Sequence, residues 1–403
     1  MALIVQKFGG SSVADAEKIE RVAWIIAEKY SEGNDMVVVL SAQGDTTDDL
    51  ITKAKEINPN PSKREMDMLL ATGEQISISL MAMQLEKLGM PVVSLLGWQV
   101  GMDTNTEYGN ARIKAVSAER MKSELDRRRI VIVAGFQGIN RNDDITTLGR
   151  GGSDTSAVAL AVALNADLCQ IYTDVEGVYT ADPNKITGAK KLEEITYDEM
   201  LELASLGAQV LHSRSVEMAK RYNVELEVLS SYVRKPGTKV KGVTKVEQSK
   251  ISGVAMDTNV GQISLMELVD RPGVAFRAFQ ALQKVKINVD IILQSVGRDG
   301  TKDISFTVAK EDMEAATKAL LDQQQLIGFS GLKASEDIAK VSIVGAGMMS
   351  APGVASLMFE ALYDAKVNIS MISSSEIKIS VIVDEKEADR AVQAIHQRFF
   401  EAG

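Results

Sequence analysis

The chain has 403 residues, 45% hydrophobic and 25% charged, and its 45 Lys and Arg against 55 Asp and Glu give a net charge of -10. This length predicts two or three domains of roughly 150 residues each. An acidic surface disfavours nucleic acid as a partner, and the absence of any apolar run of roughly 20 residues disfavours a membrane-spanning helix. One cysteine, Cys169, and two histidines, His212 and His396, cannot build a disulfide framework or a Cys/His metal site within one chain, so we expect a cytoplasmic protein with no such metal cluster.

Six short runs rich in β-branched residues alternate with helical patterns up to about residue 230. They cover residues 3–8, 36–42, 91–97, 130–136, 168–173 and 224–230. Because nearly every position in these runs is apolar, we expect an α/β domain with a mostly parallel sheet that helices cover on both faces. Met68, Ile76, Leu80, Met83 and Leu88 recur at helical spacing, which predicts an intervening helix. Ligands bind at the carboxyl ends of strands in such sheets, so the polar residues after each strand are candidates for a site.

A basic segment follows the last of these strands. Residues 234–250 contain six Lys or Arg and one acid, and Pro236, Gly237 and Gly242 interrupt any long helix. We therefore predict the α/β domain at 1–233 and a linker at 234–250.

The last part of the chain contains an internal repeat. Residues 272–292 and 352–372 align at an offset of 80 with ten identities in 21 positions, and the turn PGVA occurs in both copies. Each copy has the order strand, helix, strand, strand, helix, which is typical of a βαββαβ sandwich. The first copy adds a strand at 326–333, whereas the second needs a strand from elsewhere, for which residues 251–256 are available. We therefore predict that the first module (262–335) is inserted into the second (251–261 plus 336–403).

Two glycine-rich turns follow predicted strands and begin helices. In KFGGSS (7–12), Gly9 and Gly10 allow the backbone to approach a phosphate, and Lys7 adds a positive charge. In GRGGSD (149–154), Arg150 suits a carboxylate or phosphate, and Ser153 or Asp154 stands where a helix N-cap belongs. Ordinary tight turns and a solvated arginine would explain each motif alone, but the repeated pattern favours an anion site.

Other features of the sequence are ambiguous. Thr173 and Asp174 stand at the end of a strand, where a nucleotide site and a plain surface loop fit equally well. Glu74 lies on a helix, where a solvated carboxylate is the common case. The run GAGMMS (345–350) has Ser350 at the third glycine position of the dinucleotide fingerprint, which disfavours a nicotinamide-dependent dehydrogenase. No G-x-S-x-G elbow accompanies the two histidines, which we expect to be structural.

Several motifs, taken in order with the paired repeats, resemble the aspartokinase family over nearly the whole chain. They are KFGGSS (7–12), SAQGDTT (41–47), ATGEQ (71–75), AGFQG (134–138), TTLGRGGSD (146–154) and YTDVEGVYTADP (172–183). The resemblance implies an amino-acid-kinase fold followed by two ACT modules. It also implies phosphorylation of the side-chain carboxylate of L-aspartate by ATP with Mg²⁺, the first step toward lysine, threonine and methionine.

The resemblance also assigns roles to matching residues. Lys7, with the amides of Gly9 and Gly10, would stabilise the transferring phosphoryl group. Arg150 would bind the α-carboxylate of aspartate and Glu74 its α-amino group, while Asp154 would orient Lys7 or approach the metal ion. The rest of the substrate pocket would be Thr47, Phe136, Gly151 and Ser153, and the nucleotide would lie along Ser41, Thr173, Asp174, Tyr179 and Asp182. Asn184 and Gln209 replace an Arg and a Lys that many members have, so those two nucleotide contacts are in doubt.

The repeats imply feedback control by lysine, threonine or both, and a homodimer or larger oligomer formed through the ACT modules. Effector-binding residues would be Asp270, Gly273, Ala275, Asn288 and Gln294 in the first module and Gly353 and Asn368 in the second. A glutamate kinase and a non-catalytic amino-acid sensor remain alternatives. Assays with both substrates separate the kinases, and the presence of Lys7, Glu74, Arg150 and Asp154 argues against the sensor.

Overall fold

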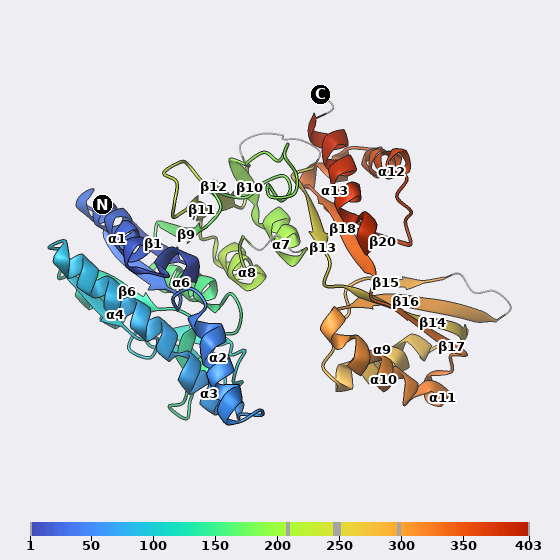
Figure 1. Cartoon of the computed structure of the whole chain (residues 1–403), viewed down its shortest axis with the longest axis horizontal. Helices are drawn as coiled ribbons and strands as arrows, with labels where there is room; N and C mark the ends of the chain where they lie inside the picture. Colours follow the sequence, from blue (N-terminus) through green and yellow to red (C-terminus); the bar gives the residue numbers. More distant parts are fainter. Residues whose placement is uncertain (1, 207–209, 245–250, 296–299, 402–403) are drawn as a thin grey trace. The chain divides into compact units, whose positions relative to one another are not determined.

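The computed structural model describes residues 2–206, 210–244, 251–295 and 300–401, which form two compact units (Figure 1). The first unit contains Met1–Tyr179, Lys191–Ser205 and Gln209–Val246, and the second contains Thr180–Lys190, Leu206–Ala208 and Glu247–Gly403. Among the described residues, no helix combines the length and the apolar character needed to cross a membrane.

The first unit is built on an eight-stranded sheet with the order β10-β12-β11-β9-β1-β2-β6-β3. Its strands are β1 (Leu3–Phe8), β2 (Asp35–Leu40), β3 (Val92–Leu95), β6 (Ile130–Ala134), β9 (Leu168–Thr173), β10 (Glu194–Thr196), β11 (Leu226–Ser230) and β12 (Thr238–Lys241). All neighbouring strands are parallel except β11 and β12. The six predicted strands are therefore confirmed, with ends that differ by a few residues.

Helices cover both faces of this sheet, as the apolar strands predicted. α1 (Ala16–Ser31) and α4 (Thr72–Lys87) pack on one face, and α6 (Gly152–Leu164) packs on the other, with α7 (Tyr197–Ser205) and α8 (Ser213–Tyr222) next to it. The remaining helices of the unit are α2 (Thr46–Ile57), α3 (Lys63–Leu70) and α5 (Glu119–Leu125). β2 and β6 are buried at nearly every position because both of their faces are covered.

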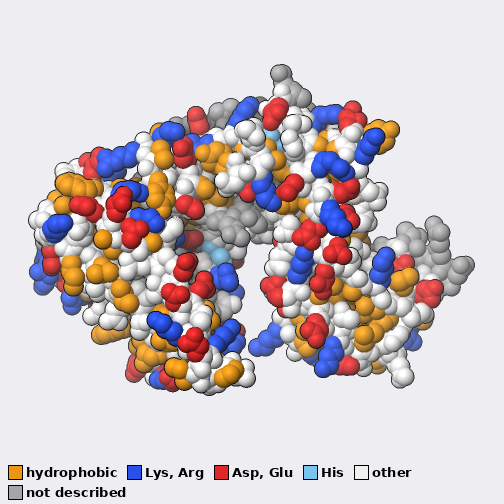
Figure 2. Space-filling model, viewed as in Figure 1, with side chains coloured by type: hydrophobic (Ala, Val, Ile, Leu, Met, Phe, Trp, Pro, Cys, Tyr) orange, Lys and Arg blue, Asp and Glu red, His pale blue; other side chains and the backbone are white. Residues whose placement is uncertain are grey.

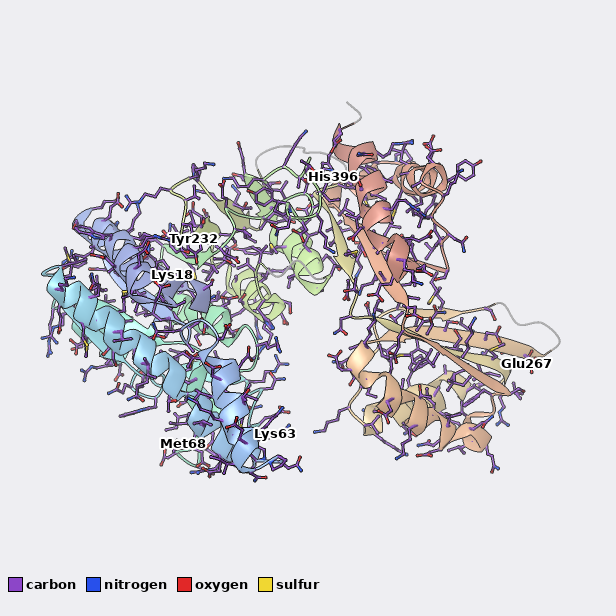
Figure 3. The ribbon with its side chains drawn as sticks, in the orientation of Figure 1. Lys18, Lys63, Met68, Tyr232, Glu267 and His396 are labelled. Atoms are coloured by element: carbon purple, nitrogen blue, oxygen red, sulfur yellow. The ribbon has the colours of Figure 1, made fainter. Side chains whose placement is uncertain are left out.

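The apolar spacing that predicted a helix does not mark the buried face of α4. Ile76, Leu80 and Met83 are exposed, and Met68 belongs to a separate helix, α3, where it is also exposed (Figure 3). The residues of α4 that face the sheet are Ile78, Met81 and Leu85. Since α4 is apolar on both sides, helical spacing alone could not identify the buried one. In the space-filling view, hydrophobic side chains interrupt the charged ones along the part of the first unit formed by α3 and α4 (Figure 2).

The predicted linker at 234–250 is also wrong in part, because residues 238–241 form β12. Thr238 and Val240 are fully buried, whereas Lys239 and Lys241 point outward and pair with glutamates. A Cβ atom at Gly237 would overlap the carbonyl oxygen of Val228, so glycine lets the chain turn back closely along β11. Two of the six basic residues that suggested a linker, Lys239 and Lys241, are thus the outward half of a strand with alternating burial.

A second, smaller sheet in the first unit contains the strand that precedes the Gly-Arg-Gly-Gly turn. It has the order β5-β4-β7-β8 and consists of β4 (Met102–Thr104), β5 (Ile113–Val116), β7 (Gln137–Ile139) and β8 (Ile145–Thr147). The sequence did not predict it because its strands have only three or four residues. β8 leads directly into the turn that begins α6.

The second unit contains two four-stranded sheets, one for each predicted module. The first has the order β15-β16-β14-β17 and the second the order β13-β18-β20-β19. The first module consists of β14 (Gly261–Val269), α9 (Val274–Lys284), β15 (Ile292–Gln294), β16 (Thr301–Val308), α10 (Met313–Leu321), α11 (Gln324–Ile327) and β17 (Gly331–Ser335). The second consists of β13 (Gly253–Asp257), β18 (Ile338–Val344), α12 (Val354–Asp364), β19 (Met371–Ser374), β20 (Lys378–Asp384), α13 (Ala388–His396) and a π-helical turn, Gln397–Glu401.

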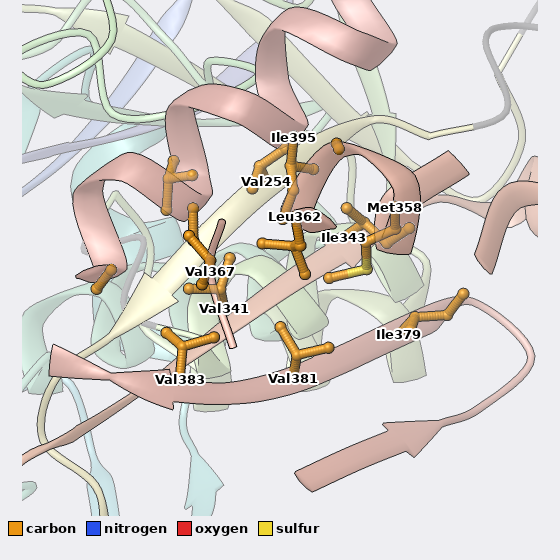
Figure 4. Packing of buried hydrophobic residues seen from close by; sticks show 14 of the residues in the cluster. Val254, Val341, Ile343, Met358, Leu362, Val367, Ile379, Val381, Val383 and Ile395 are labelled. Carbon is orange, nitrogen blue, oxygen red and sulfur yellow. The ribbon is translucent and has the colours of Figure 1, made fainter. Parts of the chain in front are cut away.

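The pairing of β13 with β18 confirms that the first module is inserted into the second. Lys340, which is almost fully buried, forms ion pairs with Asp257 of β13 and with Asp290 of the inserted module. The core of the second module lies between its sheet, with Val341, Ile343 and Val381, and its helices, with Met358, Leu362 and Ile395 (Figure 4). The strand predicted at 326–333 starts later, at Gly331, because residues 324–327 form the short helix α11.

The repeat seen in the sequence also appears in the backbone. Gly273 and Gly353 both precede a helix with left-handed φ angles, +92° and +93°. Lys286 and Lys366, again 80 residues apart, have φ angles of 60° and 54°. Glycine adopts such angles without strain, whereas lysine does so rarely. The two modules therefore share an unusual local geometry as well as an order of elements.

Residues 180–190 depart from the predicted domain boundary at 233, because they pack within the second unit. Thr180 Oγ1 lies 2.9 Å from Nε2 of the fully buried His396 (Figure 3), and its carbonyl accepts a hydrogen bond from the N–H of Val254 at 2.8 Å. Ala181 and Ile186 contribute to the core of the second module. His396 is structural in this arrangement, as the sequence predicted.

Candidate active site

Lys7 and Asp154 meet at the carboxyl end of β1. The Nζ atom of Lys7 lies 2.8 Å from Oδ1 of Asp154, in the first turn of α6, and the two side chains are only 13% and 10% exposed. Among the described residues, no donor makes a hydrogen bond of suitable geometry to Oδ1 of Asp154, so the contact with Lys7 is an ion pair. A Cβ atom at Gly9 would lie 3.5 Å from the same Nζ, so the glycine turn passes directly beside the ammonium group. The structure thus brings together the positive charge and the glycine turn predicted for a phosphate.

Gly10 lets the ends of β1 and β2 approach closely. A Cβ atom there would overlap the carbonyl oxygen of Ala42, and the N–H of Gly44 donates to the carbonyl of Gly10 at 3.0 Å. Ser41, a predicted nucleotide residue, donates its N–H to the carbonyl of Phe8 at 3.2 Å. The loop after β2 is therefore fixed against the glycine turn after β1.

Two serines that we did not predict join the ends of β1, β9 and β11. The hydroxyls of Ser12 and Ser231 lie 2.8 Å apart, and the hydroxyl of Ser231 also donates to the carbonyl of Thr173. The hydroxyl of Tyr232 donates to the carbonyl of Ser11 at 2.9 Å (Figure 3). Ser12 lies inside the KFGGSS motif, so its position in the motif was the available signal, whereas Ser231 becomes relevant only through the pairing of strands.

Glu74 is buried, whereas a glutamate on a helix is usually exposed to solvent. It is 3% exposed, and its Oε1 accepts a hydrogen bond from the N–H of Ala42 at 3.0 Å. Its Oε2 has no hydrogen-bond partner among the described residues. Burial raises the pKa of Glu74 to about 7, although the N–H of Ala42 opposes the rise. A buried carboxylate oxygen without a donor is suited to a cationic ligand.

The end of β6 packs against the beginning of α6. Phe136 has a left-handed φ of 66° and donates its N–H to Oγ of Ser156 at 3.1 Å. A Cβ atom at Gly135 would lie 2.7 Å from Oγ of Ser153, and one at Gly152 would lie 2.9 Å from the ring of Phe136. Phe136 and Ser153, both predicted for the substrate pocket, are therefore close neighbours.

The predicted N-cap of α6 is wrong. The helix begins at Gly152 after Gly151, whose φ is 66°, and no side chain caps it. Ser153 and Asp154 lie inside the first turn. The left-handed conformation of Gly151 allows the chain to enter the helix without a capping side chain, so the Asp154 carboxylate is available to Lys7.

Arg150 is exposed between two glycines with left-handed φ angles, Gly149 and Gly151. Within the described part of the chain, no carboxylate lies within ion-pair distance of its guanidinium group. Arg150 is thus free to bind an anion.

Thr47 is half-buried in the first turn of α2. The first residue of that helix, Thr46, lies against Gly73 at the start of α4.

The predicted nucleotide residues are only partly brought together. The hydroxyl of Thr173 donates to Oδ1 of Asp174 at 3.0 Å at the end of β9, and Tyr179 forms an isolated bridge with Lys191. Asp182 instead belongs to the segment in the second unit, where its carboxylate accepts the N–H of Asn184 at 2.9 Å. Gln209 lies outside the described residues.

The comparison with known proteins follows the same division of the chain. Residues 2–230 match the amino acid kinase family, and residues 263–324 and 341–399 match the ACT domain. An aspartokinase from Mycolicibacterium smegmatis is 49% identical over 405 residues, with coverage of 99% of this chain and 96% of that protein. The chain belongs to the aspartokinase family.

A second sequence relative and two solved structures support the same family. An aspartokinase from Geobacillus stearothermophilus is 50% identical over 400 residues, which cover 99% of this chain and 97% of that protein. The structure of E. coli aspartokinase III in complex with aspartate and ADP (R-state) has a TM-score of 0.83 and 27% identity, and covers 99% of this chain and 100% of that one. A second structure of that enzyme, in complex with lysine and aspartate (T-state), has a TM-score of 0.76 and 27% identity, with 99% of both chains covered.

In the ACT modules of this aspartokinase family member, the predicted effector residues lie at the two Pro-Gly turns and in the strands that follow. Asp270 pairs with Lys302 at 3.0 Å just before the first turn, which leads through Gly273 to Ala275 in α9. Asn288 precedes β15, which contains Gln294. Gly353 directly precedes the equivalent helix, α12, and Asn368 precedes β19.

Proposed function

We propose that this aspartokinase family member binds L-aspartate with Glu74 and Arg150 and transfers a phosphoryl group from ATP to its side-chain carboxylate beside Lys7. One series of contacts supports the proposal. Glu74 contacts Ala42, and Ala42 lies against Gly10. The preceding residue, Gly9, lies beside Lys7, which pairs with Asp154. An acceptor for an ammonium group and a cation for a phosphoryl group thus lie at one edge of one sheet.

The reaction needs no general base. The side-chain carboxylate of aspartate has a reference pKa of about 3.9, so it is already ionised at neutral pH. Phosphoryl transfer then depends on positioning and on positive charge around the migrating group. Lys7 supplies that charge, and Asp154 holds the ammonium group at the glycine turn. Ser41, Thr173, Asp174 and Tyr179 would lie along the nucleotide, with Thr47, Phe136, Gly151 and Ser153 around the aspartate.

A magnesium ion fits this donor set as a companion of the nucleotide. The described residues contain no group of three or more carboxylate, imidazole or thiolate ligands. Mg²⁺ is commonly held by one or two carboxylates together with substrate phosphates, where it neutralises phosphate charge. Asp154 is the carboxylate placed to contribute, and its contact with Lys7 would have to be shared.

Regulation by lysine, threonine or both is proposed for the ACT modules. The support is the doubled left-handed Pro-Gly turn, which recurs with nearly the same φ angle in both modules, together with the E. coli relative that was solved with lysine. Association of two or more chains through these modules belongs to the same proposal. Titration calorimetry with each amino acid and sedimentation of the protein test it. No heat from either amino acid, with activity unaffected, would contradict the regulatory role.

A hydroxamate assay with ATP tests the catalytic proposal, with aspartate and glutamate as alternative substrates. We expect turnover with aspartate and little with glutamate. Lys7→Ala should lower turnover by on the order of 10²-fold, whereas Lys63→Ala, which alters an exposed lysine at the start of α3, should leave it unchanged. Preference for glutamate, or full activity of Lys7→Ala, would contradict the proposal.

A further inference from the structure

The direction of Arg150 depends on the backbone of its turn. The side chain has no carboxylate partner among the described residues, and the glycines on both sides have left-handed φ angles. Within the turn, the N–H of Gly152 donates to the carbonyl of Gly149 at 2.9 Å. Glycine on both sides of Arg150 allows the backbone many conformations. The guanidinium group can therefore bind a carboxylate in one defined orientation only if other residues fix the turn.

Arg214, in the first turn of α8, binds the backbone on which this turn begins. Its Nη1 donates to the carbonyl of Leu148 at 2.6 Å and to Oδ1 of Asn110 at 3.2 Å, and its Nη2 donates to the carbonyl of Ala111 at 2.9 Å. No described carboxylate forms an ion pair with this half-buried guanidinium group. Its charge is therefore directed at the carbonyl groups of two separate segments, one of which ends next to Gly149.

Asp67, in α3, binds the same two segments through their donors. Its Oδ2 accepts the N–H groups of Gly109 and Thr147, each at 2.9 Å, and its Oδ1 accepts the hydroxyl of Thr147 at 2.7 Å. Asp67 is fully buried. The two segments are also bonded to each other, because the N–H of Ala111 donates to the carbonyl of Thr147 at 2.8 Å. The Asp67 carboxylate thus accepts hydrogen bonds from the donors of the segments at 109–111 and 147–148, and the Arg214 guanidinium group donates to their carbonyl groups.

The ring of His212 supports the other side of the turn. A Cβ atom at Gly151 would overlap this ring, so the turn lies directly on the residue that precedes α8. Asn110 likewise lies 3.2 Å from where a Cβ atom of Gly149 would be. Gly151 therefore packs on His212, the residue before α8. Gly149 packs on Asn110, which accepts a hydrogen bond from Arg214 in α8.

We propose that Arg214 and Asp67 are positioning residues that fix the turn carrying Arg150 and thereby set the affinity for the α-carboxylate of the substrate. The proposal rests on the role of Arg150 given under the proposed function. Neither residue touches the substrate in this scheme. They act through the backbone of residues 147–152, and their side-chain hydrogen bonds reach residues 109–111, 147 and 148 and not Lys7 or Gly9 on the ATP side of the site.

Arg214→Lys and Arg214→Ala test this proposal, with Arg221→Ala as a matched control. Arg221 lies on the same helix but is exposed, and its guanidinium group stacks on the ring of Tyr222. Because lysine cannot make the forked contacts of a guanidinium group, we expect Arg214→Lys to raise KM for aspartate roughly tenfold and Arg214→Ala on the order of 10²-fold, with KM for ATP changed less than about twofold. Added guanidinium chloride at millimolar concentration should partly restore the affinity of Arg214→Ala. Arg221→Ala should behave as the unaltered chain.

Hydrogen exchange gives a reading that does not require activity. In Arg214→Ala, the amides of Leu148 and Gly152 should exchange at least about tenfold faster, whereas those of β2 should not change. Equal effects on the KM values of aspartate and ATP, or unchanged exchange in residues 148–152, would overturn the proposal. If the unaltered chain does not phosphorylate aspartate but the exchange result holds, the proposed function fails and the anchoring of the turn stands. Asp67→Asn should produce the same exchange pattern, because its amide replaces an acceptor with a donor.

Discussion

Replacing Glu74 by glutamine removes a buried negative charge with little change in side-chain size. Burial raises the pKa of Glu74 from an ordinary value of 4.5 to about 7. Since each pKa unit corresponds to about 1.4 kcal/mol, keeping this carboxylate ionised at pH 8 costs the folded state about 3 kcal/mol. The folded state binds the proton more tightly than the unfolded state, so the unaltered protein gains stability as the pH falls from about 7 toward 4.5.

We therefore expect Glu74→Gln to be more stable than the unaltered chain at pH 8 by up to about 3 kcal/mol, less the cost of an unpartnered amide N–H. Near pH 5 the gain should fall below about 1 kcal/mol, because Glu74 is then protonated in the folded state. Urea unfolding followed by tryptophan fluorescence measures this difference. Both tryptophans, Trp24 and Trp98, lie in the first unit, which contains Glu74. Glu86→Gln, at an exposed position of the same helix, is the control.

The same variant should bind aspartate poorly. Loss of a charge-assisted contact with the α-amino group, of about 1.5–3 kcal/mol, corresponds to a rise in KM for aspartate of roughly 10- to 100-fold. In the unaltered enzyme, KM for aspartate should rise as the pH falls below about 7, whereas KM in Glu74→Gln should not follow pH in this range. A variant that is less stable at pH 8, or one with an unchanged KM for aspartate, would refute the reasoning.

Three further changes test other parts of the structure. Asp154→Asn leaves Lys7 without its ion-pair partner, so turnover in the hydroxamate assay should fall roughly tenfold or more; unchanged turnover would show that the pair does not position Lys7. Gly151→Ala places a methyl group against the His212 ring at a left-handed φ, which should raise KM for aspartate and lower the urea midpoint by an amount equivalent to about 1–3 kcal/mol, and a normal midpoint would contradict this. Leu362→Ala, in the core of the second module, should destabilise that unit by about 2–5 kcal/mol. Far-ultraviolet circular dichroism should then change at lower urea than tryptophan fluorescence, and coincident transitions would argue against separate unfolding of the two units.

The sequence predicted the parts of the fold that local pattern determines. The central strands were found because both of their faces are buried, and the inserted module was found because its repeat left one strand unassigned. The buried face of α4 and the strand β12 were missed, since apolar residues on both sides of a helix and lysines on the outer side of a strand hide the direction of burial.

Within the site, motifs located Lys7, Arg150 and Asp154, but they could not show which neighbours hold these residues. Asp67 binds Gly109 and Thr147, which are 42 and 80 residues away in the sequence, so no local pattern marks it. The burial of Glu74 is likewise a result of tertiary packing, because it depends on how closely Gly73 lets α4 approach Ala42.

The inserted module is attached to its host by two paired strands and not by one flexible tether. Asp257 lies opposite Lys340 in the register of β13 and β18, and Lys340 also reaches Asp290 within the insert. The chain therefore leaves and re-enters the host sheet at adjacent points, so a two-residue Asn-Gly hairpin could replace residues 258–339 and still join β13 to β18. The same attachment opposes independent rotation of the insert, because such a rotation would twist both strands together and pull Asp290 away from Lys340.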